Sequence, residues 1–210
     1  MSTIPLHLDT DVVVLPAPGA GPEMSLHAAL ERRHSSRHFL SDSLSLEALS
    51  ALLWSAFGVN RREHGGRTAP SAHNWQEIDV YAVVEAGAYR YDAAAHRLIL
   101  VKAKDLRALT GLQDFVAAAP LNLVYVADFA RMKEARDDEE RAFFAGADAG
   151  CIAQNVYLHA AAAGLATVVR GLVDRRRLAP ALGLASTQRI ALAQSVGMVG
   201  PVMEEGATPR

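Results

Sequence analysis

The segment "ERRHSSRHFL", residues 31–40, gathers three arginines, two histidines and two serines in ten positions. Arginine presents a rigid fork of donors that matches a phosphate, and serine and histidine add directional hydrogen bonds. A charge-assisted bond of this kind contributes about 1.5–3 kcal/mol where water is partly excluded. The segment is therefore a candidate anion site, whose donors are Arg33, His34, Ser35 and Arg37. A solvated basic helix end beside the negative pole of the helix dipole explains the same residues equally well on composition alone.

The overall charge of the chain and its other motifs indicate which partners fit such a cluster. The net charge is −2 and the pI is about 6.4, so we expect neither nucleic acid nor an anionic membrane as a partner. A single phosphate is favoured over a polymer backbone. His34 and His38 have the spacing of a metal-binding pair, but no third ligand follows at a recognisable spacing, and we predict no metal site. The "GAG" at residues 19–21 is a poor dinucleotide loop, because prolines and Met24 interrupt the pattern.

A second polar segment, "RTAPSAHNWQ" at residues 67–76, is rich in amide and hydroxyl groups, and Pro70 stiffens its entry. Asparagine and glutamine each carry both a donor and an acceptor, which is the complement of the edge of a heteroaromatic ring. Taken by itself, the segment is equally typical of an ordinary turn-rich loop.

The elements that must position these two segments alternate irregularly along the chain. A helix over residues 46–57 is predicted by its apolar stripe, with Ser45 as the N-cap and Gly58 after its end. Residues 59–77 read as a long polar loop. The remaining expected elements are strands at 12–15, 78–92, 96–103, 121–129 and 189–200, helices at 24–33, 105–119 and 174–184, a long Ala-rich helix ending at Gly164, and a strand or loop at 165–173. Hairpin-like strands in the middle favour an α+β fold over strict βαβ alternation.

Length and composition indicate one domain in a reducing compartment. The chain has 210 residues, half of them apolar, which suffices for one sizeable core. We expect an N-terminal arm at residues 1–23 and a single domain at residues 24–210. Cys151 is the only cysteine, so no internal disulfide can form. Neither an apolar run of membrane-spanning length nor a secretory signal pattern is found, and we expect a cytoplasmic protein.

Together, these motifs resemble the FMN-dependent nitroreductase family over residues 24–200. The resemblance is carried, in the order of the family, by "RHSSRHF", "PSAHNWQ", "GLQDFVAAAP", "GCIAQNVYLHAAAAGLAT" and "SVGMVG". The run from "WSAFGVNR" to "HRL" is similar to the branch that contains thiazoline- and oxazoline-oxidising dehydrogenases. The family implies an α+β fold with a central, mainly antiparallel sheet flanked by helices. It also implies an intertwined homodimer with two FMN sites at the subunit interface.

The resemblance also implies roles for single residues. Those expected to hold the ribityl phosphate and part of the ring edge are Arg33, His34, Ser35 and Arg37. Those expected to approach the flavin from the partner subunit are Pro70, Ser71, Ala72 and Asn74. Gln113 matches a position that hydrogen-bonds the ring or ribityl chain, and Arg170 and Gly171 match positions whose backbone N–H groups face flavin N5 and O4. Many relatives return a Lys/Arg pair to the phosphate from a longer C-terminal tail, and here Arg210 is the sole candidate.

The activity implied is an FMN-dependent oxidoreductase. NAD(P)H reduces FMN, which then reduces a nitroaromatic, a quinone or a similar small-molecule acceptor. The flavin carries this chemistry, so we predict no catalytic side chain, and we interpret Cys151 and His159 as packing residues of the Ala-rich helix. Two alternatives stay open: an FMN dehydrogenase or oxidase of azoline-like rings, and a non-catalytic flavin-binding protein.

Overall fold

The computed structural model describes residues 11–19 and 21–201. Its centre is a seven-stranded sheet with the order β1-β6-β5-β4-β7-β9-β8, in which every neighbouring pair is antiparallel. The strands are β1 Val12–Val14, β4 Ile78–Val84, β5 Gly87–Asp92, β6 Arg97–Lys102, β7 Leu121–Asp128, β8 Leu165–Arg170 and β9 Gln188–Met198. The helices are α1 Leu26–Arg32, α2 Leu46–Phe57, α3 Asp138–Ala163 and α4 Arg175–Ala181. The predicted α+β fold with a central antiparallel sheet is confirmed.

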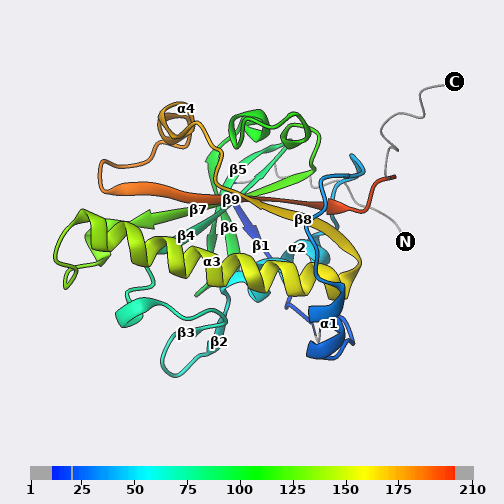
Figure 1. The fold of residues 1–210 in the computed structure, drawn as a ribbon, viewed down its shortest axis with the longest axis horizontal. Helices are drawn as coiled ribbons and strands as arrows, with labels where there is room; N and C mark the ends of the chain where they lie inside the picture. Colours follow the sequence, from blue (N-terminus) through cyan, green and yellow to red (C-terminus); the bar gives the residue numbers. More distant parts are fainter. Residues whose placement is uncertain (1–10, 20, 202–210) are drawn as a thin grey trace, which may run out of the picture.

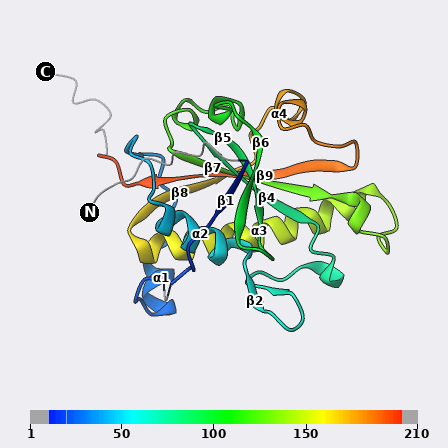
Figure 2. The same ribbon diagram turned by 180° about the vertical axis from the view of Figure 1, so that it is seen from behind.

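The sheet is buried on both faces because its central strands carry apolar residues at nearly every position. On β4, Val80 and Ala82 face the core that α2 and α3 cover, while Tyr81 and Val83 face the core that α4 covers. This alternation follows from the two-residue period of a strand. Figure 1 shows α3 along one side of the sheet and α4 on the other, and Figure 2 shows α1 and α2 near the end of α3 that leads into β8.

The helix ends follow the predicted capping residues. The hydroxyl of Ser45 accepts a hydrogen bond from the backbone N–H of Ala48 at the start of α2. Gly164, with a φ of 69°, ends α3 in the left-handed conformation that glycine adopts most readily. On α1, Ala29 alone is buried, and the two leucines Leu26 and Leu30 are exposed.

Three predicted segments differ from the structure. The expected loop at residues 59–77 contains a small hairpin, β2 Val59–Arg61 with β3 Gly66–Arg67, and a 3₁₀ turn, η1 Ala72–Asn74. Residues 78–92 form two strands joined by a two-residue turn, rather than one. The expected helix at 105–119 is wrong: it holds only the 3₁₀ turns η2 Arg107–Leu109 and η3 Asp114–Val116.

The guanidinium of Arg170 explains why residues 105–119 do not form a helix. It lies inside the bend at Thr110 and Gly111, where Nη1 donates to the carbonyl of Thr110 at 2.7 Å. A Cβ at Gly111 would lie 2.0 Å from Nη1. The chain therefore folds around a side chain that comes from β8, and a continuous helix cannot form there. A further short turn, η4 Phe129–Arg131, follows β7. In the described residues, every helix lacks the length or the apolar character needed to cross a membrane.

We expect Gly111→Ala to lower the free energy of unfolding by about 1–3 kcal/mol, because the new methyl group overlaps the Arg170 guanidinium. The matched control is Gly146→Ala on α3, where a Cβ would meet no atom within 4 Å. In the helix interior this change should stabilise the protein by about 0.5–1 kcal/mol. Urea unfolding of both variants measures the difference. Equal free energies of unfolding for the two variants would show that the bend accommodates a side chain at position 111.

Candidate functional site

The segment containing the anion-binding candidates is fixed along β8, an edge strand of the sheet. The backbone N–H of Ser36 donates to the carbonyl of Thr167 at 2.9 Å. The hydroxyls of Ser35 and Tyr157 share a hydrogen bond of 2.8 Å, and the N–H of Val169 donates to the Tyr157 hydroxyl at 2.9 Å. Tyr157, on α3, thus ties this segment to the edge strand. Four of the predicted residues, Arg33, His34, Ser35 and Arg37, are therefore brought together at one place.

The arginine side chains of this cluster have no carboxylate partner among the residues that the structure describes. Within the described ranges, neither Arg33 nor Arg37 nor His34 forms an ion pair. The guanidinium of Arg33 lies over the Tyr157 ring, 5.4 Å from its centre. His34 donates from Nδ1 to the carbonyl of Arg32 at 2.8 Å. Exposed donors with uncompensated positive charge fit a phosphate group.

Arg170 has a structural side chain. Besides its bond to Thr110, its Nη2 donates to Oδ1 of Asn122 at 2.9 Å, and only 4% of the residue is exposed. Its Nε is buried and has no hydrogen-bond partner among the described residues. Burial lowers the pKa of Arg170 to about 10. The side chain points into the protein, so only the backbone of this residue is available to a ligand.

The segments that contain Gln113 and Gly171 are joined by one backbone hydrogen bond just beyond the end of β8. The N–H of Leu112 donates to the carbonyl of Leu172 at 3.4 Å, which places Gln113 beside the segment that contains Gly171. The side-chain oxygen of Gln113 is buried and without a hydrogen-bond partner in the described part of the chain. Gly171 is exposed, and a Cβ there would meet no atom within 4 Å. The backbone from Thr167 to Gly171 is about 13 Å long at the residue spacing of a strand. The cationic cluster lies at the Thr167 end, and the exposed backbone of Gly171 lies at the other end.

The second predicted segment, containing Pro70, Ser71, Ala72 and Asn74, lies elsewhere. The N–H of Ala72 donates to Oδ2 of Asp148 on α3 at 2.8 Å. Asp148 and Tyr157 are nine positions apart on this helix, which corresponds to about 13.5 Å along its axis. A single chain therefore does not bring the two predicted segments together.

The 70–76 loop has an unusual backbone. His73, Asn74 and Gln76 have φ values of 49°, 54° and 49°, a region that side chains other than glycine occupy at a cost. Ser71 holds the loop together, because its hydroxyl accepts from the N–H of Gln76 at 2.8 Å and donates to Glu77 Oε2 at 3.1 Å.

Three side chains of this region were not predicted from the sequence: Tyr157, Glu77 and Asp148. Asp148 could have been noticed, because it is an acidic residue among alanines on the buried face of α3. Tyr157 has the appearance of a core residue in the sequence. Arg210, the candidate from the C-terminal tail, lies outside the described residues.

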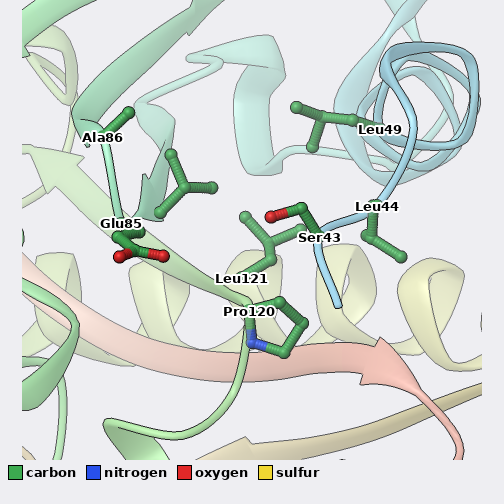
Figure 3. Close-up of a pocket in the computed structure, with 8 residues that line it drawn as sticks. Ser43, Leu44, Leu49, Glu85, Ala86, Pro120 and Leu121 are labelled. Carbon is green, nitrogen blue, oxygen red and sulfur yellow. The ribbon is translucent and has the colours of Figure 1, made fainter. Parts of the chain in front are cut away.

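One cavity lies apart from the predicted site residues, and another adjoins the end of β8. A pocket of about 200 Å³ opens between the start of α2 and the β4–β5 turn, where Ser43 and Leu49 face Glu85 and Ala86 (Figure 3). None of the predicted site residues lines it. A second cavity of about 620 Å³ lies between α3, α4 and β9, with largely apolar walls. Arg175, one of its lining residues, donates to the carbonyl of Gly171 at 3.2 Å, so this cavity adjoins the end of β8.

The fold and these motifs are those of the nitroreductase family. The model of the Nitroreductase family matches residues 30–198, and the chain belongs to that family. The resemblance inferred from the motifs is confirmed, and the chain is an oxidoreductase. A curated relative from Methanocaldococcus jannaschii, provisionally named a nitroreductase, is 34% identical over 160 residues, which cover 71% of this chain and 79% of the relative.

Solved structures share the fold. A crystal structure from Ralstonia eutropha JMP134, also provisionally named a nitroreductase, is 46% identical, with 91% of each chain covered and a TM-score of 0.87. The NADPH:FMN oxidoreductase of Vibrio harveyi in complex with NAD⁺ is 19% identical, with 88% of this chain and 72% of that chain covered and a TM-score of 0.62.

Proposed function

We propose that the protein is an FMN-dependent NAD(P)H oxidoreductase that acts as a cytoplasmic homodimer and reduces a nitroaromatic, a quinone or a similar acceptor. The observation that carries this proposal is the uncompensated cationic cluster fixed along β8, with the exposed backbone of Gly171 beyond its other end. The family membership and the shared fold of the Vibrio harveyi NADPH:FMN oxidoreductase support it. The single free cysteine, Cys151, fits a reducing compartment.

Different residues of the chain would bind different parts of FMN. Arg33, His34, Ser35 and Arg37 would hold the phosphate, with Arg210 as a further candidate. When bound, FMN supplies hydride acceptance from a nicotinamide and electron transfer to a second substrate. The backbone at Arg170 and Gly171 would orient the ring edge. Gln113 can reach the ring with its carbonyl oxygen only after a change of rotamer, because that oxygen is buried.

The partner subunit would complete the site with Pro70, Ser71, Ala72 and Asn74. In one chain these residues lie about 13.5 Å along α3 from the tyrosine that binds the cationic cluster. The 620 Å³ cavity beside Gly171 would hold the acceptor, since its apolar walls suit an aromatic ring.

We expect the purified protein to be yellow and to release FMN, rather than FAD, on denaturation. Anaerobic mixing with NADH or NADPH should bleach the visible flavin absorbance within seconds. Bleaching by a heterocyclic substrate alone would favour the azoline-type dehydrogenase. Bleaching by no donor would leave a flavin-binding protein without this activity, and a colourless protein that does not take up added FMN would contradict the proposal.

A further inference from the structure

Two carboxyl groups lie buried together beneath the 70–76 loop. Glu77 is 0% exposed and Asp148, on α3, is 7% exposed. The hydroxyl of Ser71 donates to Glu77 Oε2 at 3.1 Å, and the N–H of Ala72 donates to Asp148 Oδ2 at 2.8 Å. Each carboxyl group therefore anchors one of two neighbouring residues of the loop. Neither group belongs to the proposed phosphate or ring contacts.

The loop needs such anchors because of its backbone. Three of its residues, His73, Asn74 and Gln76, have positive φ values, and strained backbone persists only where the surroundings hold it. On the outer side, the ring of Trp75 stacks on His73 with 4.5 Å between ring centres, and its N–H donates to Glu134. On the inner side, the contacts to Glu77 and Asp148 fix the residues that precede the strained ones.

No cation among the described residues neutralises the buried pair. Within the described ranges, neither Glu77 nor Asp148 forms an ion pair. Arg131 of η4 donates to the carbonyl of Gln76 but pairs with Asp79 of β4 at 2.7 Å. The other charged side chains at the loop are Arg67, whose Nε donates to Gln76 Oε1 at 2.8 Å, and Glu134, which accepts from the Trp75 N–H. The imidazole of His73 interacts electrostatically with Glu134 and with Glu140 of α3.

A proton can replace the missing cation. Burial, and after it the negative charge of Asp148, raise the pKa of the Glu77 carboxyl to about 7. Glu77 Oε1 is buried without a hydrogen-bond partner among the described residues. A proton on this oxygen makes it a donor, and the side chain of Asp148 is within reach as the acceptor. Two adjacent carboxyl groups that share one proton attract each other, whereas two carboxylates repel.

We propose that Glu77 and Asp148 share one proton and act as a positioning pair for the 70–76 loop, so that the loop is held in place only while the pair is protonated. The link to flavin binding rests on the proposed function, in which this loop reaches the FMN of the partner subunit. Removal of the proton leaves two buried carboxylates that repel each other, and Ser71 and Ala72, which are hydrogen-bonded to them, are then displaced with them.

The pH dependence of folding follows from the same pair. The pKa of Glu77 is about 7 in the fold and 4.5 ordinarily, so the folded protein binds this proton more tightly than the unfolded chain does. The free energy of unfolding should therefore fall as the pH rises from about 4.5 to about 7, and level off above that range. Glu77→Gln should remove this slope, because an amide can donate to Asp148 and accept from Ser71 at every pH.

Trp75 reports the position of the loop without any flavin. In a Trp54→Phe background it is the only tryptophan, since the chain has two. His73→Asn removes the imidazole ring that stacks on Trp75, and asparagine tolerates the positive φ at this position. In this background we expect the fluorescence of Trp75 to change with a midpoint near pH 7, and Glu77→Gln to abolish the change. A titration that Glu77→Gln leaves unaltered would overturn the proposal.

The affinity for FMN gives the second measurement. Between pH 6 and pH 8.5, the dissociation constant for FMN should rise at least fivefold more for the dimer with native Glu77 than for the Glu77→Gln dimer. The ratio of the two constants removes the titration of the FMN phosphate, which affects both proteins equally. Equal pH profiles of the two proteins would contradict the positioning pair while leaving the proposed function intact. A Trp75 titration as expected, in a protein that binds no FMN, would support the pair and refute the proposed function.

Discussion

The Arg33→Ala/Arg37→Ala double variant should bind FMN about 100-fold more weakly than the unaltered protein. Each guanidinium is expected to form at least one charge-assisted bond to the phosphate, and about 1.4 kcal/mol corresponds to a factor of ten in affinity. Neither arginine has an ion pair to lose within the described ranges, so the free energy of unfolding of the apo-protein should change little. The loss should therefore appear in binding and not in folding.

Arg32→Ala is the matched control for this experiment. It removes the same charge one position earlier, from the last turn of α1, outside the segment that Ser36 fixes to β8. Flavin fluorescence titrations should show less than a threefold effect, and thermal melts should show all proteins folded. Equal losses of FMN affinity in Arg32→Ala and Arg33→Ala would indicate that positive charge anywhere in this segment attracts FMN, without a specific contact. Unchanged affinity in the double variant would identify the cluster as a solvated helix end.

Periodicity and capping residues predicted most of the sheet and the helices. The near-continuous apolar runs of β4 and β7, and the caps Ser45 and Gly164, act through neighbouring residues of the chain. Such local signals are read directly from a sequence. The family motifs added the order of the elements and the fold.

The failures come from contacts between distant residues. The apolar and alanine-rich character of residues 105–119 favours a helix, but the guanidinium of Arg170 bends the segment from about 60 positions further along the chain. The leucines of α1 follow a helical stripe, yet they do not pack within the chain. No local pattern contains either piece of information.

Within the described residues the candidate site was predicted as three groups, and the structure places the arginine cluster and the 70–76 loop apart. The arginine cluster is positioned by Tyr157, and the 70–76 loop by Asp148, two residues of the same helix that the sequence shows as part of an apolar stretch. The third group, at Gly171, follows β8. Sequence motifs thus identify which residues act, whereas α3 and β8 determine the distances between them.

Flavin occupancy should therefore follow dimerisation. Large apolar side chains are exposed on the elements around the site: Leu26, Leu30, Phe143 and Leu172, between 51% and 70% exposed. Exposed apolar surface of this kind is typical of a subunit interface. If the loop of one chain completes the flavin site of the other, bound FMN must favour the dimer by linkage. Dilution of the protein should release FMN in step with dissociation, measured by sedimentation at the visible flavin absorbance.

Asn74→Gly isolates the contribution of the loop to this linkage. Glycine accepts the φ of 54° without strain, which offsets the loss of the exposed hydrogen bond from Gln76 to Asn74 and the entropy cost of glycine, so the apo-protein should melt within a few degrees of the unaltered protein. The variant loses the side chain proposed to reach the partner's flavin, and FMN affinity should fall about tenfold or more. A matched Asn60→Gly change, at an exposed position of β2, should leave the affinity unaltered. A monomer that retains one FMN per chain would show that the site is built within one subunit, and the separation of the two segments along α3 would then have no role in binding.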